Sequence, residues 1–151
     1  MDLSHKTNSE ILEGLTAWVG KERVAGSHVL HYLREVQERK LYLPYASTLF
    51  EFCMKVHKYS RHEAQTRIDA MKLMKIVPEI DSDIDSGRLS LTVAAQAQSA
   101  FRKEDSWRKA AGENPLTGER VVARSRRICH ALELPVKDDY SAFLRKLIIS
   151  R

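Results

Sequence analysis

The stretch STLFEFCMKVHKYSRHEAQTRIDAMKLMKIVPEIDSDIDSGRLSLTVAA, residues 47–95, indicates the fold of this chain most directly. Its apolar residues recur every three or four positions, a spacing typical of amphipathic helices, and no strand-like alternation or hairpin turn breaks it. Ser60 and Glu63 have the spacing of a capping box, which predicts that a helix begins at this serine. Pro78 and Gly87 suit the first turn and the end of the next short helix. The stretch therefore predicts a series of helices separated by tight turns.

The remaining sequence continues this pattern, and we expect an all-α, multi-helix fold. Thr7 and Glu10 form another capping-box pattern, and one helical face then carries the apolar residues Ile11, Leu12, Leu15, Trp18 and Val19. A second helix is predicted from about residue 21 to about residue 42, where Pro44 stops it. The helix that opens at Ser90 is predicted to end near Phe101.

The predicted helices divide into three parts. Residues 1–101 are expected to form a helical domain with a helix-turn-helix at about 47–77. Residues 102–118 are polar, contain glycine and proline, and are interpreted as a basic linker. Residues 119–151 carry two C-terminal helices, which are expected either to pack on the core or to pair with a second copy. The apolar side chains behind this possible homodimer are Phe143, Leu144, Leu147 and Ile148.

Composition restricts the class of protein. The chain has 151 residues, of which 43% are hydrophobic and 30% charged, as in a globular domain with a real core rather than a disordered chain. No apolar run is long enough for a membrane span, and the N-terminus lacks the apolar stretch of a signal peptide. Two cysteines do not imply a disulfide framework. We therefore expect a cytoplasmic protein, away from membranes and without a cofactor.

Net charge is +5, and the positive charge gathers in residues 60–78 and 101–130. Such a distribution suits a polyanionic partner but is also common as a solubility feature.

The helix predicted from Ser60, at about residues 60–76, has two unlike halves. At 100° per residue one side carries a narrow apolar stripe for the core, made of Ala64, Ile68, Met71 and Met74. The opposite side of the first half is polar and carries His62, Gln65, Thr66 and Asp69, with Arg61 at the amino end. From Leu73 onward the helix is apolar nearly all round. An exposed polar start and an embedded end are typical of a DNA recognition helix.

The chemistry of these side chains suits a duplex. Arg61 can donate two bonds to a guanine edge, Gln65 can pair with adenine, and Thr66 offers a hydroxyl or methyl contact. Ser60 and the amides at the helix start suit a phosphate. Further cations are candidates for backbone contacts that set the register, namely Lys55, Lys58, Arg67, Lys72, Arg88, Arg102 and Lys103. The alternative interpretation is a solvated helix face.

Several of these segments together resemble the helical N-terminal region of a bacterial HNH endonuclease family. The likeness rests on residues 47–53, 59–70, 77–80 and 87–92, and it extends to residues 38–43, 97–105 and 123–130. A looser likeness links residues 60–95 to the helix-turn-helix of ParB-type partition proteins. There too, a Ser-Arg start to the recognition helix is followed by a Pro-Glu helix and a Gly-x-Leu-Ser step. The resemblance implies sequence-directed binding of double-stranded DNA.

The sequence departs from the endonuclease pattern after this region. Those enzymes continue into a ββα metal site whose histidines activate water and hold a divalent ion. No such site follows Cys129-His130 before Arg151. The resemblance therefore carries over DNA binding and no intrinsic catalysis. Two alternatives stay open: the DNA-targeting N-terminal part of an HNH endonuclease, and a helical protein–protein interaction module.

Other candidate sites are weaker. His28 and His31 lie three residues apart, but no acid or thiolate accompanies them on the same face, so no metal site is predicted. Cys53 and Cys129 are expected to pack as small apolar residues. The alternating acids Asp81, Asp83 and Asp85 lack the bidentate ligand of a calcium loop and are expected to form a solvated helix face or a rim that repels phosphate.

Overall fold

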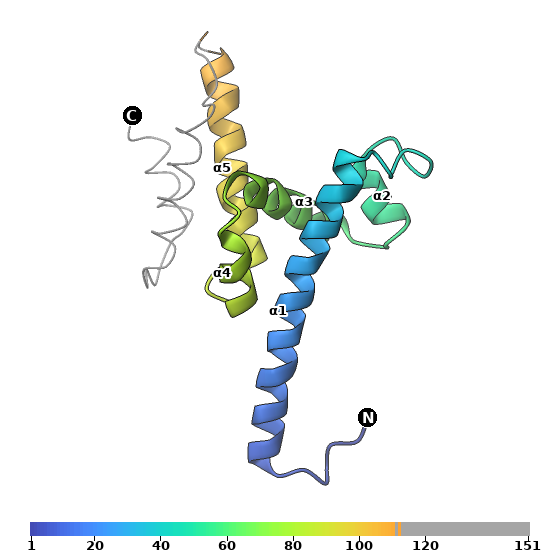
Figure 1. Cartoon of the computed structure of the whole chain (residues 1–151), viewed down its shortest axis with the longest axis vertical. Helices are drawn as coiled ribbons and strands as arrows, with labels where there is room; N and C mark the ends of the chain where they lie inside the picture. Colours follow the sequence, from blue (N-terminus) through green and yellow to red (C-terminus); the bar gives the residue numbers. More distant parts are fainter. Residues whose placement is uncertain (111, 113–151) are drawn as a thin grey trace.

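The computed structural model describes residues 1–110 and residue 112, and these form an all-α arrangement (Figure 1). The helices of this part of the chain are α1 (Asn8–Glu38), α2 (Leu49–Lys55), α3 (Arg61–Ile76), α4 (Ile80–Ser86) and α5 (Leu91–Ala110). No strand occurs among the described residues, so the predicted fold class is confirmed. The predicted C-terminal helices and the later part of the predicted linker lie outside the described residues.

The first helix differs from the prediction. Two helices were expected before residue 43, but α1 runs unbroken for 31 residues. Its start is fixed by the predicted capping box: the Thr7 hydroxyl accepts a hydrogen bond from the Glu10 amide, and the Glu10 carboxylate accepts one from the Thr7 amide at 2.7 Å. A glycine inside a helix costs only about 1 kcal/mol relative to alanine, so Gly20 and Gly26 do not interrupt it.

The two halves of α1 have different surroundings. Its C-terminal half packs against α3 and α4, and Leu30 and Leu33 are buried there. Its N-terminal half extends beyond the other described helices, as the blue end of the ribbon in Figure 1 shows. The apolar face identified from the sequence in this half is largely open, with Leu12, Leu15 and Trp18 each more than 60% exposed. No other described helix reaches that far along α1 (Figure 1).

The core is built around α3. This helix packs against α1, α2 and α5, and its predicted apolar stripe is fully buried. The stripe residues are Ala64, Ile68, Met71 and Met74, as expected, and Ala70 and Leu73 are buried beside them. The other helices add Phe52, Cys53, Ile80, Ile84, Ala94, Ala97 and Phe101. The second half of α3 is thereby surrounded by apolar contacts.

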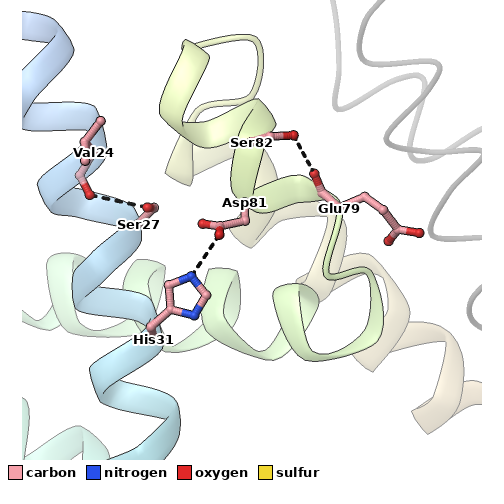
Figure 2. Close-up of polar contacts among 6 residues, drawn as sticks. All are labelled: Val24, Ser27, His31, Glu79, Asp81 and Ser82. Atoms are coloured by element: carbon pink, nitrogen blue, oxygen red, sulfur yellow. Dashed lines mark hydrogen bonds and ion pairs between the residues drawn. The ribbon is translucent and has the colours of Figure 1, made fainter.

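A polar contact joins α1 to α4 (Figure 2). His31 Nε2 of α1 lies 3.0 Å from Asp81 Oδ2 of α4. Nearby, the Ser27 hydroxyl donates a hydrogen bond to the Val24 carbonyl, and the Ser82 hydroxyl donates one to the Glu79 carbonyl. Asp83 accepts a hydrogen bond from Arg88 on the following turn. These two acids are therefore engaged by α1 and by the turn after α4, with the Asp81 side chain 37% and the Asp83 side chain 15% exposed.

The last described helix also differs from the prediction. It was expected to end near Phe101, but α5 continues to Ala110 through the first part of the predicted linker. The added residues include arginine, lysine, glutamate and alanine, which are good helix formers. The first strong breaker, Gly112, follows the helix and adopts φ +73°. This extension matters because it places Arg102 on a helix that packs against α3.

None of the described helices is both long enough and apolar enough to cross a membrane.

Candidate nucleic-acid interface

The start of α3 is held in place by its own side chains. Lys58 adopts a left-handed conformation with φ +59°, which turns the chain between α2 and α3. The Ser60 hydroxyl accepts a hydrogen bond from the Glu63 amide at 3.2 Å, and the Glu63 carboxylate accepts one from the Ser60 amide at 2.8 Å. The Ser60 amide, followed by its hydroxyl, lowers the pKa of Glu63 below its usual value. The predicted capping box is confirmed.

This cap also changes the expectation for Ser60. The residue was predicted to suit a phosphate together with the free amides at the helix start; its amide donates to the Glu63 carboxylate, and its hydroxyl oxygen accepts from the Glu63 amide. The Glu63 carboxylate there would repel a phosphate. Ser60 therefore orients the helix, and the surrounding cations are the stronger candidates for contact with an anion.

The first two turns of α3 stand clear of the core. Arg61, His62 and Gln65 are exposed, and Thr66 and Arg67 are half-buried. From Ile68 to Met74, in contrast, only Lys72 is not buried. The predicted division of this helix into an exposed polar start and an embedded end is therefore present.

Two arginines near this start rest on aromatic rings. The guanidinium of Arg61 lies 5.7 Å from the Phe50 ring, and that of Arg67 lies 4.4 Å from the Tyr59 ring. Arg67 also donates a hydrogen bond to the Glu63 carbonyl at 3.3 Å. A guanidinium stacked on a ring keeps N–H groups at its edge for a second partner.

Two lysines lie just before this start. Lys55 and Lys58 are exposed, and Lys55 makes only a long contact of 3.8 Å with Glu51. Four of the predicted cations thus lie around the N-terminal end of α3, namely Lys55, Lys58, Arg61 and Arg67.

Asp69 is placed differently from the prediction. It was expected on the solvated face, but it is only 3% exposed. Arg102 of α5 donates a hydrogen bond to its Oδ1 at 2.8 Å, and Gln65 donates one to its Oδ2 at 2.9 Å. The reason is the longer α5, which covers this part of α3. A bidentate contact with adenine uses both the oxygen and the NH₂ group of the Gln65 amide. Gln65 would therefore have to give up its hydrogen bond to Asp69 in order to make that contact.

A second basic group lies farther along the same side of α3. Lys72 follows Gln65 by seven residues, which brings it back to nearly the same helical face. It lines an open pocket of about 400 Å³ together with Gln98, Arg102, Asp105, Ser106 and Lys109. The predicted cations Lys72 and Arg102 are thus brought together. Lys109 is an addition to the predicted set, and only the unexpected length of α5 brings it here.

The remaining predicted residues are less directly placed. Arg88 lies on the turn after α4, where it pairs with Asp83, at the end of α4 that points away from α3 (Figure 1). It is not part of the group at the start of α3. Lys103 belongs to α5, but its side chain lies outside the described part of the structure.

No cluster of three or more potential metal ligands occurs among the described residues. Comparisons with protein-family models, with curated proteins and with solved structures gave no match. The resemblances to HNH endonucleases and to ParB-type proteins therefore stay predictions from the sequence.

Proposed function

We propose that this chain binds double-stranded DNA through a helix-turn-helix formed by α2 and α3, without intrinsic catalysis. The observation that carries the proposal is the division of α3. Arg61, His62 and Gln65 project from a capped and exposed start, while the second half of the helix is fixed in the core. A helix anchored in this way can enter the major groove, which is about 12 Å wide, without losing its packing.

The positions of the cations support this arrangement. From Arg61 to Lys72 the helix axis rises about 16 Å at 1.5 Å per residue, which is comparable with the width of the major groove. One group of cations, with Lys55 and Lys58, lies at the start of this segment. The other group, with Lys72, Arg102 and Lys109, lies at its end. The two groups suit phosphates on opposite sides of the groove, and the intervening side chains suit base edges.

The test compares preferred and random DNA. A preferred duplex is first selected from random sequence by the wild-type protein, and binding is then measured by fluorescence anisotropy. The double variant Arg61→Ala/Gln65→Ala should lose about 1–3 kcal/mol per lost base contact on the preferred duplex and much less on random DNA. Equal losses on both duplexes would mean that these side chains do not read bases.

A second variant isolates the phosphate contacts. Lys72→Ala/Lys109→Ala should weaken binding to all duplexes alike and reduce the slope of log K against log salt by about 2. Lys6→Ala removes an exposed lysine of the N-terminus and serves as the control, with no change expected beyond a small general effect. Absence of binding to any duplex at low salt would reject the proposal and favour a protein partner for the polar face.

The sequence resemblance favours a second candidate, the DNA-targeting part of an HNH endonuclease. The same interface would then direct a catalytic domain to its site. The genomic reading frame beyond Arg151 tests this candidate, since such an enzyme requires a histidine-containing ββα segment there. A stop codon at that point would reject it.

A further inference from the structure

A second apolar stripe runs along nearly the whole of α1. Positions 11, 15, 18, 22, 25, 29, 32 and 36 alternate spacings of four and three residues. They carry Ile11, Leu15, Trp18, Glu22, Ala25, Val29, Tyr32 and Val36, so that a single charged residue interrupts the run. An average repeat of 3.5 residues is the spacing with which one helix packs along another as a coiled coil.

This stripe is offset from the most deeply buried face of α1, although Val29 and Val36 in its C-terminal part also pack against the edge of the core. The buried residues Ser27, Leu30 and Leu33 lie about 110° around the helix from it, at 100° per residue. Trp18 is 63% exposed and Tyr32 is 75% exposed. Along residues 11–18 and at Tyr32 the stripe is therefore largely exposed.

The C-terminal part of the stripe forms one wall of a groove. Ala25, Val29, Tyr32 and Val36 line this wall, and Phe52, His57 and Tyr59 of α2 and the turn after it line the groove with them. The volume is about 580 Å³, and the lining is mostly apolar. Grooves of this kind receive the apolar face of an added helix.

We propose that a second copy of this chain supplies the added helix. The two α1 helices pack antiparallel, and the protruding N-terminal half of each lies along the groove of the other. The arrangement is reciprocal, so two copies close a two-fold dimer in which both grooves are filled. It does not depend on DNA binding.

Charge selects the register of the pair. Lys21 and Glu35 occupy equivalent positions beside the stripe, two helical repeats apart. In the antiparallel register in which position 18 faces position 36, each Lys21 lies about 3 Å along the helix axis from the Glu35 of the other copy. Two symmetric ion pairs can form there beside the stripe, where Glu35 otherwise pairs with Arg39 of its own chain. The Lys21 ammonium already lies 4.1 Å from the Trp18 ring, at the edge of the stripe.

The same register explains the exposed apolar residues. Trp18 meets Val36 of the second copy, and Ala25 meets its Val29. Glu22, the charged exception in the stripe, meets the Tyr32 side chain, whose hydroxyl can donate to the carboxylate.

Beyond this overlap, Ile11 and Leu15 reach past the end of the other α1. They come to the exposed Leu41 and Leu43, which follow that helix and are 50% and 55% exposed. In the dimer these contacts cover four apolar side chains that are exposed in the single chain: Ile11, Leu15, Leu41 and Leu43.

Sedimentation velocity of the full chain over a concentration series tests the proposal. The wild type should be a dimer, and Trp18→Asp or Tyr32→Asp should raise its dissociation constant about 100-fold or more, since a central aromatic residue is lost from both halves. Ala17→Asp is the matched control, because Ala17 is exposed in the same segment but lies on another side of α1. Circular dichroism should show that each variant keeps its helices. A monomeric wild type would overturn the proposal.

Charge reversal tests the register. Lys21→Glu and Glu35→Lys should each weaken the dimer about tenfold by placing like charges opposite one another, and the double variant should return to within about threefold of wild type. A double variant as weak as the single ones would overturn the antiparallel register. Leu144→Asp/Leu147→Asp probes the alternative dimer through the C-terminal segment. A dimer that this change dissociates, but that Trp18→Asp leaves intact, would overturn the proposal.

Discussion

The contact between Arg102 and Asp69 predicts a measurable loss of stability when the guanidinium is removed. The Asp69 carboxylate is almost fully buried and accepts bonds from Arg102 and Gln65. Arg102→Met keeps most of the aliphatic length of the side chain but removes the only cation paired with this carboxylate in the described structure. The buried Asp69 carboxylate would then keep only one hydrogen-bond donor, the neutral amide of Gln65. Burying the carboxylate without a cation costs appreciable desolvation free energy.

The size of the loss follows from the exposure of the two partners. Removing one member of a fully buried ion pair costs about 3–5 kcal/mol, whereas an exposed pair contributes about 1 kcal/mol or less. The Asp69 side chain is 4% exposed but that of Arg102 is 50% exposed, so water screens one side of the pair. We therefore expect the free energy of unfolding to fall by about 2 kcal/mol, between these limits.

Urea unfolding at neutral pH, followed by far-ultraviolet circular dichroism, measures this change. Arg34→Met is the control: Arg34 is similarly exposed, at 42%, but its partner Glu38 is 39% exposed rather than buried. The control should cost about 0.5 kcal/mol. A double-mutant cycle with Asp69→Asn then isolates the coupling energy between the two side chains. If Arg102→Met costs no more than Arg34→Met, burial of Asp69 does not strengthen the contact and the reasoning is wrong.

Two further predictions concern single side chains. Cys53 is fully buried, and burial raises the pKa of its thiol; in a Cys129→Ser background a thiol reagent should therefore label it at least about 100-fold more slowly than in concentrated urea. Rapid labelling of the folded protein would show that this part of the core opens easily. The pKa of Glu63 is lowered in the folded state, mainly by the Ser60 amide, so its stabilising effect should be complete above the usual pKa of 4.5 and lost as the pH falls through the folded value. In urea titrations the stability difference between wild type and Glu63→Gln should accordingly shrink below about pH 4. A difference that is unchanged at pH 3 would contradict this role of the carboxylate.

Local patterns predicted the local structure well. The pairs Thr7–Glu10 and Ser60–Glu63 both form the capping boxes expected from their spacing. The helical period also identified which side of α3 enters the core, because a narrow apolar stripe leaves one way to pack. These features depend on residues within one or two turns of each other.

The differences concern contacts between distant residues. The partner of Asp69 lies 33 positions along the chain, on a part of α5 that was interpreted as a linker. Periodicity alone therefore placed Asp69 in solvent.

In α1 the sequence carries two apolar faces. The period of a helix does not decide which of them meets the core, because that choice depends on the positions of α3 and α4. The predicted phosphate contact of Ser60 stays a prediction, but the neighbouring Glu63 carboxylate already accepts the hydrogen bond of the Ser60 amide.

The protruding half of α1 has a consequence for local helix–coil equilibrium. Gly14 and Gly20 lie in this half, and a methyl group added at either would meet no other described part of the chain within 4 Å. Each glycine therefore weakens the helix by about 1 kcal/mol relative to alanine without a packing gain. A free helix of about 12–15 residues is marginal in water. At protein concentrations low enough for the proposed dimer to dissociate, amide protons in this half should therefore exchange with solvent far faster than those beside Leu30. Slow exchange there would in turn report that another surface has come to lie along it.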